Sequence, residues 1–209
     1  LRVLCLQDEI ADHTLKMLRG AMAECRMGNP GRLTTDIGPV IDSEAKANIE
    51  RHIQTMRSKG RPVFQAVREN SEDAREWQSG TFVAPTLIEL DDFAELQKEV
   101  FGPVLHVVRY NRNQLPELIE QINASGYGLT LGVHTRIDET IAQVTGSAHV
   151  GNLYVNRNMV GAVVGVQPFG GEGLSGTGPK AGGPLYLYRL LANRPESALA
   201  VTLARQDAE

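Results

Sequence analysis

The sequence predicts an α/β protein with a largely parallel sheet flanked by helices. Short apolar, β-rich runs alternate along the chain with segments whose apolar residues recur at helical spacing. The helical segments that separate the strands are about ten to twenty residues long, as in crossover connections between parallel strands. With 209 residues, 42% of them hydrophobic and 22% charged, the chain has the composition of a globular domain.

The first half of the chain contains two of the predicted helices. "LRVLCL" indicates a short buried strand, and a helix is predicted from Asp8 to Met27, ending at "GNPG". Ser43 is expected to cap a second helix that ends at Gly60. The next predicted elements are strands in "RPVFQAV" and "TFVAPTLIEL", a short helix over Phe93 to Glu99 and a strand in "PVLHVVRY".

The second half leads to a glycine-rich loop. A helix over Gln114 to Ala124, a strand in "GLTLGVHT", a helix over Asp138 to Ala148 and a strand in "GNLYVN" are predicted in turn. "QPFGGEGLSGTGPKAGGP" (167–184) then packs seven glycines and three prolines into eighteen residues, before a final helix in "PLYLYRLL". Ligands of parallel α/β sheets gather beyond the carboxyl ends of strands, so the loop after "GNLYVN" is well placed for a site.

Composition excludes several classes of function. The net charge is −4 and no basic run is longer than a pair, so we expect no nucleic-acid binding through this segment. No stretch approaches eighteen apolar residues, so no membrane span is expected. The two cysteines and five scattered histidines lack metal-ligand spacing, and we predict no metal site and a cytoplasmic location. Because the chain begins at Leu1, inside an apolar run, we expect a piece of a longer protein.

Three groups of residues are candidates for chemistry. Backbone N–H groups of the glycine-rich loop can form an anion nest, or the loop can simply pack tightly over the sheet. Glu99 can accept hydrogen bonds from ribose hydroxyls beside the flat ring of Phe101, or it can be a solvated surface charge. Cys5 lies among leucines and a valine, and Cys25 lies on the apolar stripe of a helix, so structural roles are favoured over nucleophilic ones.

Four motifs occur in a fixed order: "DIGPVI" (36–41), "FVAPTLI" (82–88), "EVFGPVLHV" (99–107) and "PFGG…LSGTG" (168–178), with "YGLTLGVHT" and "GNLYVN" between the last two. Together they resemble the catalytic domain of the NAD(P)-dependent aldehyde dehydrogenase superfamily. The ending "SGTGPKAGGP" is similar to the glutamate γ-semialdehyde (Δ1-pyrroline-5-carboxylate) dehydrogenase branch, and most of all to the dehydrogenase module of bifunctional proline-catabolising enzymes.

The resemblance implies a role for particular residues. Glu99 would hold the nicotinamide ribose of NAD and Phe101 would flank the nicotinamide. Backbone donors of Gly182 and Gly183 would anchor the α-carboxylate of glutamate γ-semialdehyde. Substrate would also be bound by three further residues: Ser175, Asn156 and Phe169. The implied chemistry is attack of a cysteine on the aldehyde, hydride transfer to NAD, and hydrolysis of the thioester.

The same resemblance implies that much of the enzyme lies outside this chain. The nucleophilic cysteine of the family would precede Leu1 by a few residues, and the general base and the dinucleotide-binding domain would lie further upstream. We therefore expect residues 1–191 to be a partial catalytic domain, inactive alone, and residues 192–209 to be an extension toward an oligomerisation or tail region. A homo-oligomer is expected, and FAD would belong to a proline-oxidising part elsewhere in the polypeptide.

Several alternatives remain open from sequence. They are an aldehyde dehydrogenase with another substrate, a non-catalytic dimerisation module of the same fold, and a free-standing anion-binding module. The preference between NAD and NADP is also open.

Overall fold

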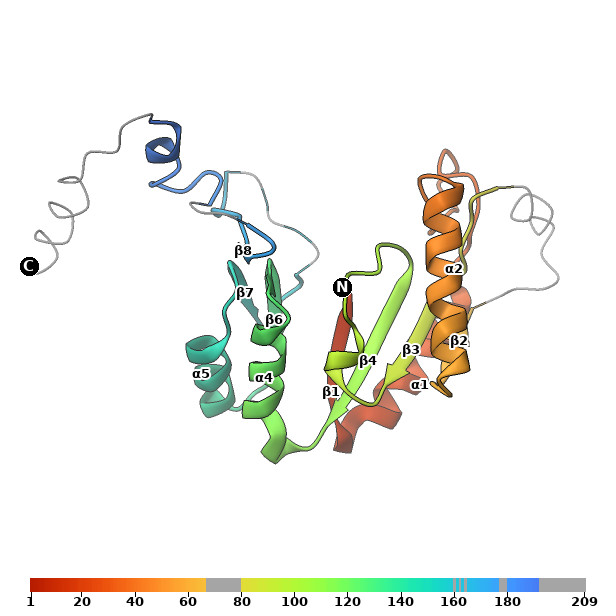
Figure 1. Ribbon diagram of the computed structural model, residues 1–209, viewed down its shortest axis with the longest axis horizontal. Helices are drawn as coiled ribbons and strands as arrows, with labels where there is room; N and C mark the ends of the chain where they lie inside the picture. Colours follow the sequence, from red (N-terminus) through yellow and green to blue (C-terminus); the bar gives the residue numbers. More distant parts are fainter. Residues whose placement is uncertain (67–79, 160, 162, 164, 177–179, 192–209) are drawn as a thin grey trace, which may run out of the picture. The chain divides into compact units, whose positions relative to one another are not determined.

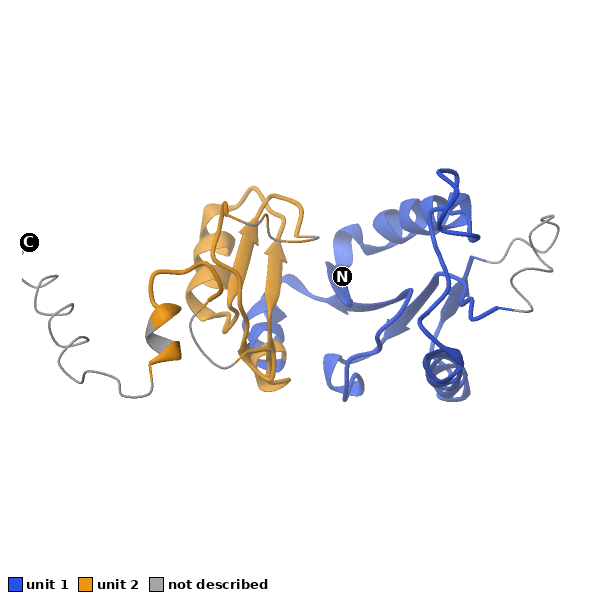
Figure 2. Cartoon of the chain, turned by 90° about the horizontal axis from the view of Figure 1, so that it is seen from above, with its two compact units in different colours: residues 1–121 blue, residues 122–209 orange. Residues whose placement is uncertain are grey.

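The computed structural model describes residues 1–66, 80–159, 161, 163, 165–176 and 180–191. The chain forms two compact units, Leu1–Gln121 and Ile122–Glu209, whose boundary lies inside helix α4 (Leu115–Ala124) (Figure 2). The expected extension, 192–209, lies outside the described residues. Among the helices that the described residues form, none is long and apolar enough to cross a membrane.

Unit 1 is built on a four-stranded sheet with the order β1-β4-β3-β2 (Figure 1). Strand β4 (Val104–Tyr110) runs parallel to both of its neighbours, β1 (Val3–Gln7) and β3 (Thr86–Leu90). The short strand β2 (Val63–Gln65) is antiparallel to β3 at the edge. The prediction of a largely parallel sheet is therefore confirmed.

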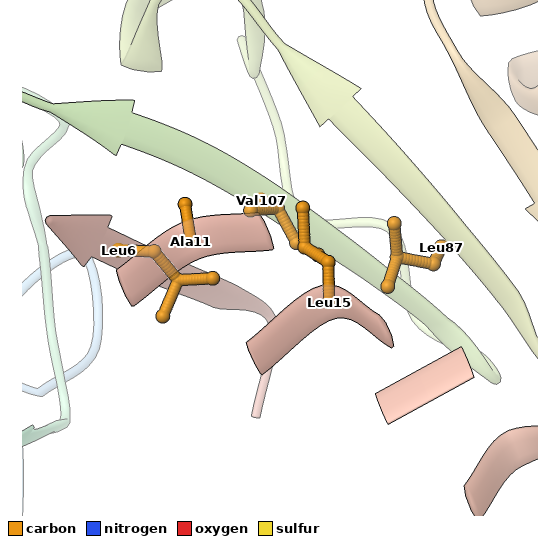
Figure 3. Packing of buried hydrophobic residues seen from close by; sticks show 5 residues of the cluster. All are labelled: Leu6, Ala11, Leu15, Leu87 and Val107. Carbon is orange, nitrogen blue, oxygen red and sulfur yellow. The ribbon is translucent and has the colours of Figure 1, made fainter. Parts of the chain in front are cut away.

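Helices α1 (Asp8–Glu24) and α2 (Ser43–Ser58) cover opposite faces of this sheet (Figures 1 and 2). The hydrophobic cluster on the α1 side consists of five buried residues (Figure 3): Leu6, Ala11, Leu15, Leu87 and Val107. Successive side chains of a strand alternate between faces, so His106 turns toward α2, where the ring of His52 contacts it. Both helices are held by an apolar stripe, as their sequence periodicity predicts.

Two helix predictions in unit 1 need correction. Asp42, not Ser43, caps helix α2, because the Asp42 carboxylate accepts a hydrogen bond from the Ala45 N–H at 2.7 Å and the Asp42 backbone is still extended. The helix expected over Phe93 to Glu99 is a single 3₁₀ turn, η1 (Phe93–Glu95), closed by a capping box between Asp92 and Glu95. Runs of 3₁₀ helix longer than one turn are uncommon because their hydrogen-bond geometry is poor.

Unit 2 contains a parallel strand pair and the glycine-rich loop. Strands β6 (Thr130–Val133) and β7 (Asn152–Val155) are joined through helix α5 (Asp138–Ser147). The Asn123 amide at the end of α4 donates to the Ser147 carbonyl and accepts from the His149 N–H, both at 2.8 Å. The helix predicted in "PLYLYRLL" is only the short 3₁₀ helix η3 (Leu187–Leu190).

The glycine-rich loop folds back onto strand β5 (Tyr127–Gly128) through the short strand β8 (Glu172–Gly173). The loop backbone also passes so close to Gly151 that a Cβ there would overlap the carbonyl oxygen of Gly170. Glycine permits this approach because it has no side chain. The loop is thus packed against the sheet and shaped by backbone contacts, rather than acting as a linker.

Candidate functional site

The turn that carries Glu99 and Phe101 lies between η1 and β4 in unit 1. Val100 is buried and anchors the turn, so its two neighbours point outward, and the Phe101 side chain is 75% exposed. Gly102 lies close to helix α2, because a Cβ at that position would meet the Cδ1 of Ile49. The turn therefore presents a carboxylate and an aromatic ring side by side at the surface.

A residue that sequence reasoning missed, Arg2, joins this pair. The Arg2 Nε donates to Glu99 Oε1 at 2.9 Å, and the guanidinium carbon lies 4.4 Å from the centroid of the Phe101 ring. Arg2 and Glu99 are 97 residues apart in sequence. The only local signal was an arginine at the start of an apolar strand, which by itself indicates nothing about its partners.

Cys5 lies on β1, where its Cα pairs with that of Val108 on β4. Burial raises the pKa of the Cys5 thiol to about 12. A thiol in this environment stays protonated at neutral pH and is a poor nucleophile. The prediction that Cys5 is structural is supported by this shift. Cys25 lies just past the end of α1, where its Sγ contacts the Ala21 carbonyl oxygen at 3.6 Å.

Asn156 follows the carboxyl end of β7 in unit 2. Its backbone is left-handed, with φ of 52°, a conformation that asparagine tolerates better than most residues. The side-chain Oδ1 accepts from the Thr135 N–H at 2.9 Å, and Nδ2 donates to the Thr135 carbonyl at 2.8 Å. Both ends of the Asn156 amide thus brace the segment that leads from β6 into α5.

Ser175 and Phe169 are structural members of the glycine-rich loop. The Ser175 Oγ accepts a hydrogen bond from the Gly128 N–H at 3.1 Å. Phe169 and Ala181 form an isolated antiparallel bridge with reciprocal backbone hydrogen bonds of 3.0 and 2.9 Å. This bridge joins the backbone near the start of the loop, at Phe169, to the backbone near its end, at Ala181.

The predicted anchor residues, Gly182 and Gly183, end a tight turn. Gly182 has φ of 73°, as the third residue of a type II turn requires, and the Gly183 N–H donates to the Lys180 carbonyl at 2.9 Å. The Gly183 donor is therefore used inside the turn, whereas no described residue accepts from the Gly182 N–H. Of the two predicted backbone donors, Gly182 is the one that can reach a ligand without breaking a hydrogen bond.

A hollow of about 350 Å³ opens beside this loop. Two cationic side chains, Arg157 and Lys180, line it together with Gln167, whose Nε2 donates to the Tyr154 hydroxyl at 2.7 Å. The Arg157 guanidinium carbon lies 5.0 Å from the centroid of the Tyr154 ring. None of the predicted site residues lines the hollow, and sequence reasoning had not singled out either cation.

The predicted residues thus fall into two sets. Glu99 and Phe101 belong to unit 1, and the loop residues and Asn156 belong to unit 2. Within the part of the chain that the structure describes, no group of three or more His, Cys, Asp or Glu side chains is arranged to hold a metal ion.

A chain with this sheet, the exposed Glu-x-Phe turn and the glycine-rich loop belongs to the aldehyde dehydrogenase family, whose model matches residues 1–192. The sequence is 91% identical over 208 residues to the bifunctional protein PutA of Salmonella typhimurium and 58% identical over 196 residues to that of Rhizobium meliloti. It is also 38% identical over 182 residues to 1-pyrroline-5-carboxylate dehydrogenase 1 of Halalkalibacterium halodurans. The resemblance to this branch is confirmed.

Solved structures agree with these relationships. A crystal structure of a proline utilization A variant from Bradyrhizobium japonicum matches with a TM-score of 0.81 and 49% identity, over 90% of this chain and 18% of that one. Betaine aldehyde dehydrogenase from Staphylococcus aureus matches with a TM-score of 0.73 and 27% identity, over 85% of this chain and 35% of that one. The chain spans only 16% of the length of the Salmonella relative.

Proposed function

We propose that this chain is the C-terminal part of an NAD-dependent glutamate γ-semialdehyde dehydrogenase, contained in a bifunctional enzyme of proline catabolism. The names of the relatives support this assignment, because the chain is 91% identical to a bifunctional PutA protein and 38% identical to a 1-pyrroline-5-carboxylate dehydrogenase. Glutamate γ-semialdehyde is the open-chain form of 1-pyrroline-5-carboxylate, so one substrate accounts for both names.

The Lys180–Gly183 turn is the observation that carries the substrate assignment. The N–H of its left-handed Gly182 has no acceptor among the described residues, and the Phe169–Ala181 bridge holds the turn in place. Such donors bind carboxylates, and the substrate carries an α-carboxylate at the end opposite its aldehyde. Lys180 and Arg157 line the adjacent hollow and add positive charge that attracts the carboxylate.

The Glu99–Phe101 turn supplies the cofactor side of the proposal. Glu99 accepts from Arg2 through Oε1, and a carboxylate has further lone pairs on its second oxygen for ribose hydroxyls. Phe101 keeps 75% of its surface exposed, enough for a nicotinamide ring to pack on it. Bound NAD would accept the hydride of the oxidation. Because the proposal assigns the nucleophile and the general base to other parts of the polypeptide, we expect this chain to be inactive alone.

Replacement of Gly183 tests the substrate assignment in the full polypeptide that contains this chain. A Cβ at Gly183 would lie 2.9 Å from the Lys180 carbonyl oxygen and 3.5 Å from the Pro168 Cβ. Gly183→Leu should therefore distort the turn and raise KM for the semialdehyde by about tenfold or more, while KM for NAD changes less than about twofold. Gly146→Ala in helix α5 is the matched control, because a Cβ there meets no atom within 4 Å.

The outcomes separate the alternatives. An equal rise in both KM values, or no rise, contradicts the anchor. Equal kcat/KM for the semialdehyde and for aldehydes without a carboxylate would indicate another substrate class. A full polypeptide that forms no NADH from any aldehyde would indicate a non-catalytic module of this fold.

We also propose that this chain contacts other domains or a second copy of itself and that the protein is cytoplasmic. Exposed apolar surface in unit 2 supports contact with another domain or a second copy of the chain. The large apolar side chains exposed along the C-terminal part of this unit are Val163, Val166, Leu174, Leu185, Leu187, Leu190 and Leu191. Upstream domains of the same polypeptide, including an FAD-dependent proline-oxidising part, are the first expected partners. Both cysteines are free thiols, in keeping with the reducing cytoplasm.

A further inference from the structure

The Arg2 guanidinium lies directly against both candidate cofactor residues. It donates to Glu99 Oε1 at 2.9 Å, lies 4.4 Å over the Phe101 ring, and places Nη1 3.3 Å from the Gly102 carbonyl oxygen. One side chain thus contacts three of the residues that form the turn. Its planar, multidentate guanidinium suits this arrangement, since it can stack on a ring and donate in its plane at the same time.

The backbone of Arg2 is also fixed. Its carbonyl oxygen accepts from the His106 N–H at 3.1 Å and lies 3.3 Å from Nδ1 of the same histidine. His106 is only 1% exposed and lies on β4, the strand between β1 and β3. Arg2 therefore extends from a rigid framework toward an exposed turn.

Stability alone does not account for this contact. The Arg2 and Glu99 side chains are 36% and 44% exposed, and ion pairs exposed to this degree contribute little to the free energy of folding. What the contact does determine is orientation. The guanidinium occupies one oxygen of Glu99 and packs against Phe101, and so limits the rotamers available to both side chains.

We propose that Arg2 is a positioning residue for the nicotinamide riboside of the cofactor. By holding Glu99 Oε1 and packing on the Phe101 ring, it presents the second carboxylate oxygen to the ribose hydroxyls and the free part of the ring to the nicotinamide. Preorganisation of this kind lowers the entropy lost on binding. This inference rests on the proposed function, which assigns the cofactor to Glu99 and Phe101.

The test uses the full polypeptide and measures the dissociation constant of NAD⁺ by titration calorimetry, together with kcat and both KM values. Arg2→Met keeps much of the side-chain length but removes the charge and the planar group. We expect it to raise the dissociation constant about tenfold and to leave KM for the semialdehyde within about twofold. Arg2→Lys keeps the charge without the stacking plane and should raise the dissociation constant about threefold.

The chain offers a matched control at Arg19. This residue also pairs with a glutamate, Glu89 at 2.6 Å, and lies over a phenylalanine ring, Phe64 at 5.9 Å, but on helix α1. Arg19→Met should leave NAD⁺ binding unchanged. The variants Glu99→Gln and Phe101→Leu serve as references for loss of the direct cofactor contacts.

Each pattern of results either supports or contradicts the positioning role of Arg2. The proposal is supported if Arg2→Met weakens NAD⁺ binding and if its effect on the dissociation constant is not additive with that of Glu99→Gln in the double variant. If Glu99→Gln and Phe101→Leu weaken binding but neither Arg2 variant does, the positioning role is wrong and the proposed function stands. If none of the four variants changes NAD⁺ binding, both the role of Arg2 and the cofactor assignment are wrong. If Arg19→Met weakens binding as much as Arg2→Met, the effect is a general loss of stability and the specific role is overturned.

Discussion

The Nε2 atoms of His52 and His106 lie 2.8 Å apart, so helix α2 and strand β4 share a hydrogen bond between two imidazole rings. The Nδ1 of His106 faces the Arg2 carbonyl oxygen, which can only accept, and this Nδ1 therefore carries the hydrogen. The Nε2 of His106 is then the acceptor and His52 donates to it. This arrangement requires the His106 ring to be neutral, because its Nε2 must be unprotonated to accept.

Acidification should destabilise unit 1 through this pair. Burial, reinforced by His52, lowers the pKa of His106 from 6.5 to about 4, and burial with the nearby Lys59 and Lys98 lowers the pKa of His52. A histidine whose pKa is lower in the folded state binds its proton more tightly in the unfolded chain. The stability is therefore fully present above pH 6.5 and is lost as the pH falls from 6.5 toward 4, by up to about 3 kcal/mol for His106.

Denaturant unfolding at a series of pH values measures this loss. His106→Asn should flatten the fall in the free energy of unfolding between pH 6.5 and 4. A wild-type free energy of unfolding that is constant across this interval would contradict the neutral state of His106 in the folded protein.

Cys5 should be inert toward thiol reagents and toward aldehydes. Its pKa of about 12 leaves almost no thiolate at pH 8, and its strand position limits access further. Alkylation of the native chain with iodoacetamide should modify Cys25, and Cys5 should react only after denaturation. Mass spectrometry of tryptic peptides distinguishes the two sites.

The same reasoning predicts that this chain alone forms no NADH from glutamate γ-semialdehyde and NAD. Absorbance at the NADH maximum follows the reaction directly. Turnover above background that disappears in Cys5→Ala would make Cys5 the nucleophile and would overturn the assignment of that role to an upstream cysteine.

Gly151 should be among the least replaceable residues of unit 2. Gly151→Ala forces a Cβ into the Gly170 carbonyl oxygen and should lower the free energy of unfolding by about 2 kcal/mol. Gly146→Ala should instead raise it by about 0.5 to 1 kcal/mol, because Gly146 lies in helix α5 with open space around it. Equal effects of the two substitutions would mean that the loop does not pack on Gly151 as described.

The sequence by itself determined the fold class and the approximate place of most elements. Periodicity located α1 and α2 because each buries a single apolar face, and the strand around His106 was recognisable because it is buried on both sides. It also located the Glu99 turn and the glycine-rich loop, since glycine and proline constrain the backbone locally. The ends of the elements were predicted less accurately. The N-cap of α2 is Asp42 and not the predicted Ser43, because Asp and Ser are about equally good caps.

Tertiary structure alone decided which distant residues meet. Arg2 and Glu99 are separated by 97 residues and His52 and His106 by 54, and nothing in the local sequence of either pair specifies the other partner. These contacts arise because β1 pairs in parallel with β4 in one register, with Val3 opposite His106, while α2 covers the other face. Likewise, the Gly183 N–H is held inside its own turn, whereas no described residue accepts from the Gly182 N–H, a distinction that depends on backbone dihedral angles and not on residue type.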